Sequence, residues 1–253
     1  MNYRKDGPYT FMRLFAIGDL HLSGNPPKKP MEVFGPRWKN HWQRIADDWK
    51  ERVTDDDTVL IAGDTSWAMR LDEAQEDLDE IRALPGKKII IRGNHDYWWA
   101  SAGKLNRMDA ENNMHYLYGS TAVLDDGNFV ICGTHGWICP GDIHYQEERD
   151  AKPYRRELLR VERTLQEAEK LQCRHTILML HYPPVCDLTK PSGFTELLEK
   201  YQVPLCIFGH LHGMQPGTMF PRRYNGTLLH LVSADYRDCK LLEIKFDGEE
   251  ALP

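Results

Sequence analysis

The chain has 253 residues, and its 32 Lys and Arg against 38 Asp and Glu give a formal net charge of −6. Hydrophobic residues make up 41% and charged residues 28%, which is typical of a globular protein and excludes a disordered or collagen-like chain. The acidic balance argues against a protein that wraps nucleic acid or lies on an anionic membrane. A chain of this length can bury a sizeable core.

The cellular setting is predicted from what the sequence lacks. No apolar run reaches the roughly 18–20 residues of a membrane span, and residues 1–11 carry charges without the apolar stretch of a secretory signal. The six cysteines form no Cys-x-x-Cys pair, which favours reduced thiols. We therefore expect a cytoplasmic protein with no membrane partner.

Short apolar runs, each followed at once by Gly and polar residues, predict strands buried on both faces. The clearest examples, taken with the polar residues that follow them, are 14–21, 58–64, 87–96, 176–184 and 205–212. Further strands are expected at 128–133, 227–233 and 239–246. Apolar residues at helical spacing predict helices over 37–52, from 71 to the Pro85-Gly86 breaker, and over 154–171. This alternation of strands and helices is typical of an α/β fold with a largely parallel sheet.

The domain organisation is expected to be simple. The sequence contains no repeat and no linker long enough to separate two domains. The first core strand follows Met12 and Arg13 closely, so residues 1–11 are interpreted as an N-terminal extension. Residues 12–253 are then a single domain.

Polar side chains suited to metal binding follow five of the predicted strands, where ligands of open α/β sheets gather. The set is Asp19, His21, Asp64, Asn94, His95, Asp96, His181, His210 and His212. Residues two apart in an extended segment point to the same side, so each Asp-x-His or His-x-His pair can present two donors to one place. Imidazole and carboxylate ligands favour Mn, Fe or Zn. Seven candidate ligands, all of the set except His95 and Asp96, are natural for two ions that share a bridge.

Each motif alone has an ordinary structural explanation, since a lone Asp-x-His is a weak signal and Gly63-Asp64 resembles a simple turn. The blocks 93–96 and 209–212 are sharper, because flexible and polar residues have no packing role directly after an apolar run. It is the whole series at successive strand ends that favours a metal centre.

In this order the motifs resemble the calcineurin-like metallophosphoesterase superfamily, and in particular its bacterial branch of predicted phosphohydrolases. The resemblance implies the metallo-dependent phosphatase fold, a four-layer αββα sandwich of two mixed β-sheets flanked by helices. It also implies two metal sites. One comprises Asp19, His21 and His212. The other comprises Asn94, His181 and His210, with Asp64 bridging the two ions.

The resemblance also implies roles for the two remaining residues. His95 lies beside the substrate phosphoryl group and protonates the leaving oxygen as general acid, and Asp96 orients His95. Many relatives carry a second Asp or an Arg soon after the bridging carboxylate. Here 63–70 reads GDTSWAMR, so only Arg70 is a candidate for gripping the phosphate, and a weak one.

We therefore expect hydrolysis of a phosphomonoester or phosphodiester by a hydroxide activated by two divalent transition-metal ions, with Mn or Fe preferred and Zn as an alternative. Small-molecule and protein phosphoesters both remain open as substrates, whereas nucleic acid is not favoured. The alternative is a non-catalytic metal-binding scaffold with the same fold. Residues 136–153 are expected to form a loop that sets substrate choice. Four tryptophans near the motifs are interpreted as packing under the site loops, with an aromatic wall as the alternative: Trp67, Trp98, Trp99 and Trp137.

Overall fold

The computed structural model describes residues 12–253, and its strands form two six-stranded sheets. The first sheet contains β1 (Leu14–Ile17), β2 (Thr58–Ile61), β3 (Lys87–Ile91), β4 (Met114–Leu117), β11 (Leu242–Asp247) and β12 (Glu250–Leu252). The second contains β5 (Ser120–Leu124), β6 (Phe129–Gly133), β7 (His175–Leu180), β8 (Leu205–Phe208), β9 (Arg222–Tyr224) and β10 (Thr227–Leu231). Their orders are β12-β11-β1-β2-β3-β4 and β5-β6-β7-β8-β10-β9.

Both sheets are mixed. The central strands β1 to β4 run parallel, as do β6, β7, β8 and β10. Antiparallel strands β11 and β12 extend one edge of the first sheet, while β5 and β9 form the two edges of the second. The parallel centre brings the carboxyl ends of the ligand-bearing strands to one side of the molecule.

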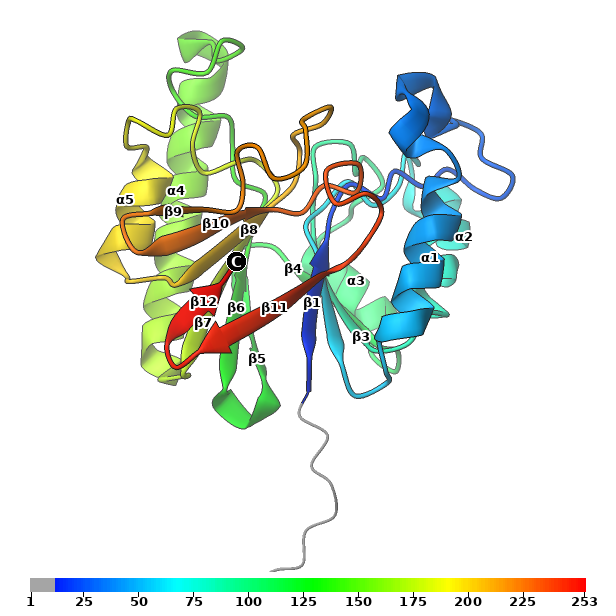
Figure 1. Cartoon of the computed structure of the whole chain (residues 1–253), viewed down its shortest axis with the longest axis horizontal. Coiled ribbons are helices and arrows are strands. Elements are labelled where there is room, and N and C mark those ends of the chain that lie inside the picture. Colours follow the sequence, from blue (N-terminus) through cyan, green and yellow to red (C-terminus); the bar gives the residue numbers. More distant parts are fainter. Residues whose placement is uncertain (1–11) are drawn as a thin grey trace, which may run out of the picture.

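Helices cover the outer face of each sheet, so the molecule has four layers (Figure 1). The first sheet is covered by α1 (His41–Arg52), α2 (Leu71–Arg82) and α3 (Ala102–Met108). The second is covered by α4 (Glu147–Leu171) and α5 (Gly193–Lys200). Three short 3₁₀ helices complete the described chain: η1 (Met31–Phe34), η2 (Pro36–Trp38) and η3 (Asp125–Gly127). The predicted αββα sandwich is confirmed.

The continuous apolar runs arise because each central strand is covered on both faces. In β1, Phe15 and Ile17 pack in the cluster beneath α1 and α2, whereas Leu14 and Ala16 pack in the cluster between the two sheets. All four residues are buried. Burying one such large side chain contributes about 1.5–3 kcal/mol, so the strand is stabilised from both sides.

Part of the predicted loop at 136–153 is helical, because α4 begins at Glu147 rather than near residue 154. The buried Asp150 carboxylate accepts a hydrogen bond from the Gln146 backbone N–H at 2.8 Å, which satisfies a free donor at the helix start. Acidic residues in the first turn, Glu147 and Glu148 among them, complement the helix dipole. The helix continues through Pro153 to Leu171.

Several elements carried no clear sequence signal. Edge strand β5 is only partly buried, and the short helices α3 and α5 have too few turns to show a sustained apolar period. The predicted extension at 1–11 lies outside the described residues. Within residues 12–253, no helix is long and apolar enough to cross a membrane.

Candidate metal centre

All seven predicted ligands lie just beyond the carboxyl ends of central strands. Asp19 and His21 follow β1, Asp64 follows β2, and Asn94 follows β3. From the second sheet, His181 follows β7, and His210 and His212 follow β8. Because the two sheets pack face to face, these strand ends meet at one edge of the sandwich.

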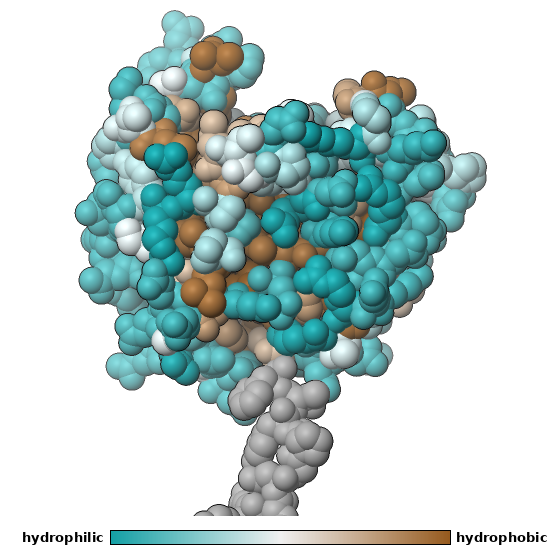
Figure 2. All heavy atoms as spheres, viewed as in Figure 1, coloured by the Kyte–Doolittle hydropathy of each residue, from teal (hydrophilic) through white to brown (hydrophobic). Residues whose placement is uncertain are grey.

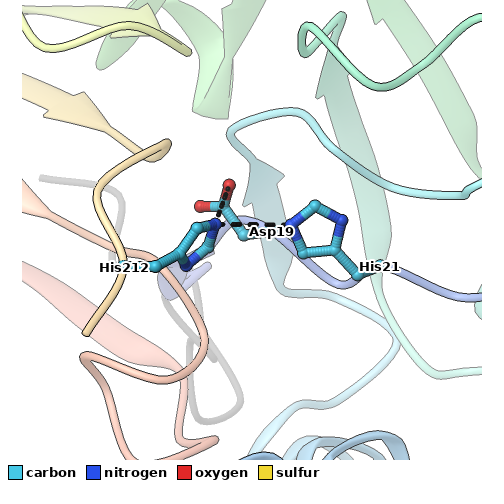
Figure 3. A group of neighbouring side chains, drawn as sticks. All are labelled: Asp19, His21 and His212. Carbon is cyan, nitrogen blue, oxygen red and sulfur yellow. Dashed lines mark hydrogen bonds and ion pairs between the residues drawn. The ribbon is translucent and has the colours of Figure 1, made fainter. Parts of the chain in front are cut away.

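The first predicted ligand group is assembled in the structure. The Nε2 atom of His212 lies 3.4 Å from Nε2 of His21 and 3.5 Å from Oδ1 of Asp19. Figure 3 shows Asp19 and His21, from the segment after β1, converging with His212 from the segment after β8. Their donor atoms all lie within 4.8 Å of one another, a spacing that allows them to hold one ion.

The second group meets around the amide oxygen of Asn94. This Oδ1 atom lies 2.7 Å from Nε2 of His181 and 2.8 Å from Nδ1 of His210. The Oδ2 atom of Asp64 lies 3.5 Å from Nε2 of His181 and 3.8 Å from Nε2 of His21. Asp64 therefore lies close to a histidine of each group, and with Asp19 and His181 it forms a second set of donor atoms that lie within 4.8 Å of one another.

The local backbone is shaped for this convergence. Four of the ligand residues have positive φ angles of 47–72°, a conformation that non-glycine residues rarely adopt: Asp19, His21, Asp64 and His210. Each such residue costs on the order of 1–3 kcal/mol, and such strain gathers at functional sites. Close packing also demands glycine, because a Cβ at Gly93 would collide with Asp64 Oδ1 and one at Gly209 with Asp19 Oδ2.

The electrostatics suit a divalent cation. Burial, together with the nearby Asp96 and Asp19 charges, raises the pKa of Asp64 to about 7. Burial also lowers the pKa values of His21 and His210 to about 3, which leaves neutral imidazoles able to donate a lone pair. No Lys or Arg of residues 12–253 forms an ion pair with Asp19 or Asp64. Two buried carboxylates that no Lys or Arg of the described chain neutralises fit a bound metal.

His95 lies beside the ligands without joining either group. Its ring centroid is 5.8 Å from that of His21 and 4.4 Å from that of the half-buried Trp67. Its backbone N–H donates to Asp64 Oδ1 at 2.8 Å, which ties the position of His95 to the proposed bridge. Burial lowers the pKa of His95.

Asp96 contacts the loop around His95 rather than its ring. The buried carboxylate accepts hydrogen bonds from the backbone N–H groups of Gly93, Thr65 and Ser66 and from Trp98 Nε1. Among the hydrogen bonds of residues 12–253, none joins it to the His95 imidazole. Through these contacts Asp96 holds the backbone segments around His95, and its orienting role stays a prediction.

One functional neighbour was not singled out from the sequence. Asp235 is buried, and its carboxylate accepts hydrogen bonds from His212 Nδ1 at 2.9 Å and from the Gly213 backbone N–H at 2.8 Å. Burial opposes the charged form of His212, but the carboxylates of Asp19 and Asp235 raise its pKa to about 10. The sequence feature that could have identified Asp235 is its position, because it closely follows a predicted strand, as the ligands do.

A cavity of about 640 Å³ opens beside the ligand cluster. His21, His95 and His212 line its inner end, and the segment 31–38 supplies much of its wall. None of residues 136–153 lines this cavity, so the segment expected to set substrate choice does not form it. Packing under the site loops accounts for buried Trp98, whereas Trp67 lines the cavity.

Arg70, the weak candidate for a phosphate contact, lies away from this cavity. Its guanidinium forms ion pairs with Asp72 at 2.9 Å and with Glu73 at 3.4 Å, and its side chain is 68% exposed. Because the Arg70 guanidinium is already paired with these two carboxylates, its positive charge is not free to bind a phosphate. Arg70 is therefore not available as a phosphate ligand in this arrangement.

Comparison with known proteins places this site in a family. A search of curated sequences finds no significant match. A structure described as a protein of unknown function from Aquifex aeolicus is 18% identical, with a TM-score of 0.52 over 92% of this chain and 96% of that chain. The calcineurin-like phosphoesterase YfkN from Bacillus subtilis is 13% identical, with a TM-score of 0.51 over 95% and 87%.

The sulfate thiohydrolase SoxB from Thermus thermophilus is 14% identical, with a TM-score of 0.53 over 99% of this chain and 58% of that chain. At such identities the likenesses show a shared fold. The family model for calcineurin-like phosphoesterases matches residues 12–214, a range that includes every predicted metal ligand. The chain therefore belongs to the calcineurin-like phosphoesterase family.

Proposed function

We propose that this chain hydrolyses a phosphoester with the help of two divalent metal ions, Mn or Fe. The observation that carries the proposal is the convergence of donor atoms from Asp19, His21 and His212 and from Asp19, Asp64 and His181 into two overlapping groups. Within residues 12–253, no Lys or Arg is paired with the Asp64 carboxylate. When bound, two such ions supply a nucleophilic hydroxide near neutral pH and stabilise negative charge on the phosphoryl oxygens.

Each ligand side chain is assigned to an ion. One ion would be held by Asp19, His21 and His212. The other would be held by Asn94, His181 and His210, and Asp64 would contact both ions. Hydrogen bonds fix two of these imidazoles. The Nδ1 atom of His181 donates to the Ala62 carbonyl at 2.9 Å, and Nδ1 of His212 donates to Asp235. Because Nδ1 is engaged in both rings, their Nε2 lone pairs are directed inward.

His95 would protonate the leaving oxygen. Its ring lies at the boundary between the ligand cluster and the cavity, where the bond to the leaving group must break. The negative charge of a bound phosphate favours the protonated imidazole and so opposes the effect of burial. The contribution expected of such an acid is about 10²–10⁴-fold.

The proposal is tested by metal analysis and a substrate screen on protein purified without chelator. We expect about two transition-metal ions per chain and hydrolysis of at least one phosphomonoester or phosphodiester when Mn²⁺ is added. His181→Ala should abolish both properties, whereas His115→Ala, at an exposed position of β4, should preserve them. Bound metal without turnover of any ester would favour the scaffold alternative instead.

A further inference from the structure

The cavity beside the ligand cluster is far larger than a phosphoryl group requires. Its volume of about 640 Å³ lies within the range of about 300–1,000 Å³ typical of sites for drug-sized molecules. His95 lines it, and on the proposed function His95 is the group that protonates the leaving oxygen. The leaving group must therefore extend into this cavity.

The wall of the cavity is mainly apolar and aromatic. Met31 and Trp38 are buried, and Trp67 is half-buried, with its ring stacked on His21 at 4.8 Å. The Trp38 ring meets His212 edge-on, with centroids 5.4 Å apart. These aromatic side chains form a surface that is continuous with the ligands.

Several polar groups of the wall away from the ligands are already paired with other parts of the protein. Arg37 donates to the Met214 carbonyl and, at 3.0 Å, to Gln215 Oε1. The Trp67 indole N–H points to Met31 Sδ, and Asp235 accepts from His212 and Gly213. Because these groups are engaged, the wall offers apolar contact in preference to the hydrogen bonds that a sugar or a polyol needs.

Phe34 stands at the mouth of the cavity. It is 67% exposed and yet lines the cavity, so a ligand inside would cover part of its ring. Its neighbour Val33 is 76% exposed but is not part of the lining. Figure 2 shows hydrophobic colour at the tip of the projection where Figure 1 places this part of the chain.

We propose that the substrate is a phosphoester whose leaving group carries an aromatic ring, and that Phe34 selects it by packing against that ring. This inference rests on the proposed phosphoesterase function. Each favourable aromatic contact is expected to contribute about two- to tenfold to binding. Phe34, Trp38 and Trp67 surround the space that such a ring would enter.

The kinetic test uses phosphate esters of primary alcohols, whose leaving groups differ little in intrinsic reactivity: methyl, cyclohexylmethyl, benzyl and 2-naphthylmethyl phosphate. We expect kcat/KM to be at least about tenfold higher for the naphthylmethyl than for the methyl ester, and higher for benzyl than for cyclohexylmethyl. Phe34→Ala should remove about tenfold of the naphthylmethyl rate and spare methyl phosphate. Val33→Ala is the matched control and should change neither, while Phe34→Trp should retain the preference that Phe34→Leu loses.

A binding measurement separates this inference from the proposed function. Calorimetric titration of the protein as purified without chelator with 2-naphthylmethanol should show binding that Phe34→Ala weakens and Val33→Ala does not. If no ester is hydrolysed, methyl phosphate included, the proposed function is wrong. If esters are hydrolysed without an aromatic preference, or if Phe34→Ala and Val33→Ala behave alike in both assays, the inference is wrong and the proposed function stands.

Discussion

The Oδ1 atom of Asp235 accepts a hydrogen bond from Nδ1 of His212 at 2.9 Å, and both groups are held by the turn in which Gly213 N–H donates to the other carboxylate oxygen. When a metal ion displaces the Nε2 proton of His212, this contact keeps the remaining proton on Nδ1. The Nε2 lone pair is then directed toward Asp19 and His21, with which it forms the first ligand group.

Loss of this contact should weaken metal binding. Asp235→Ala leaves the His212 ring free to rotate and change tautomer, and removal of such an outer partner typically costs 10–100-fold in metal affinity. Titration calorimetry with Mn²⁺ measures the effect. Asp109→Ala, which removes another buried carboxylate outside the ligand set, should lower thermal stability and leave affinity unchanged. Equal affinities for the Asp235 variant and the wild type would contradict this role.

Asp64→Asn should reduce the affinity for both ions, because its carboxylate lies between the two ligand groups. The amide keeps the shape of the side chain and removes its charge, so loss of metal reflects electrostatics rather than packing. Elemental analysis of the purified variant provides the measurement. Retention of both ions would show that Asp64 is not a shared ligand.

His95→Ala should slow the hydrolysis of alkyl phosphates far more than that of nitrophenyl phosphate. Alkoxides need a proton to leave, whereas nitrophenolate leaves unaided, so the loss of about 10²–10⁴-fold should fall on the alkyl esters. Metal content should stay the same, because His95 lies outside both ligand groups. Equal losses on the two ester classes would remove His95 from the role of general acid.

Gly93→Ala should disrupt the centre although the change adds only a methyl group. Its Cβ would overlap with Asp64 Oδ1, so the backbone or the carboxylate must move away. We expect lower metal content and a lower melting temperature. Gly103→Ala is the control, because in α3 the new Cβ meets only the end of the flexible Arg107 side chain, at 3.6 Å, and alanine favours the helix by about 0.5–1 kcal/mol. Identical behaviour of the two variants would contradict the packing argument.

Metal removal should destabilise the protein, because the native state binds the ions and the unfolded chain does not hold the site. At a metal concentration of 100 times the dissociation constant, the stabilisation is about 2.7 kcal/mol. For a domain of this size that corresponds to a rise in melting temperature of about 5–10 °C. Thermal unfolding with chelator and with added Mn²⁺ measures it, and Asp64→Asn should show a much smaller difference. If the melting temperature of the wild type is the same with and without chelator, tightly bound ions are excluded.

The sequence by itself determined the central strands and the ligands at their ends. Runs such as 14–17 and 59–62 are apolar at every position because helices cover one face of the sheet and the other sheet covers the opposite face. Asp19 and Asp64 follow these runs directly, so their place at the strand ends is encoded within a few residues of chain. The motif order then led to the family, which the match over residues 12–214 confirms.

Only the tertiary structure decided what surrounds the ligands. Segment 31–38 is interrupted by Gly35 and Pro36 and shows no apolar period, so nothing local assigns it to the cavity wall. Its place depends on contacts such as that of Arg37 with Met214, 177 residues further along the chain. Asp235 likewise meets His212 only because β8 and β10 are adjacent in the second sheet. The spacing of apolar residues in one segment reflects which of its side chains are buried. Which loops contact one another depends instead on the packing of the whole sandwich.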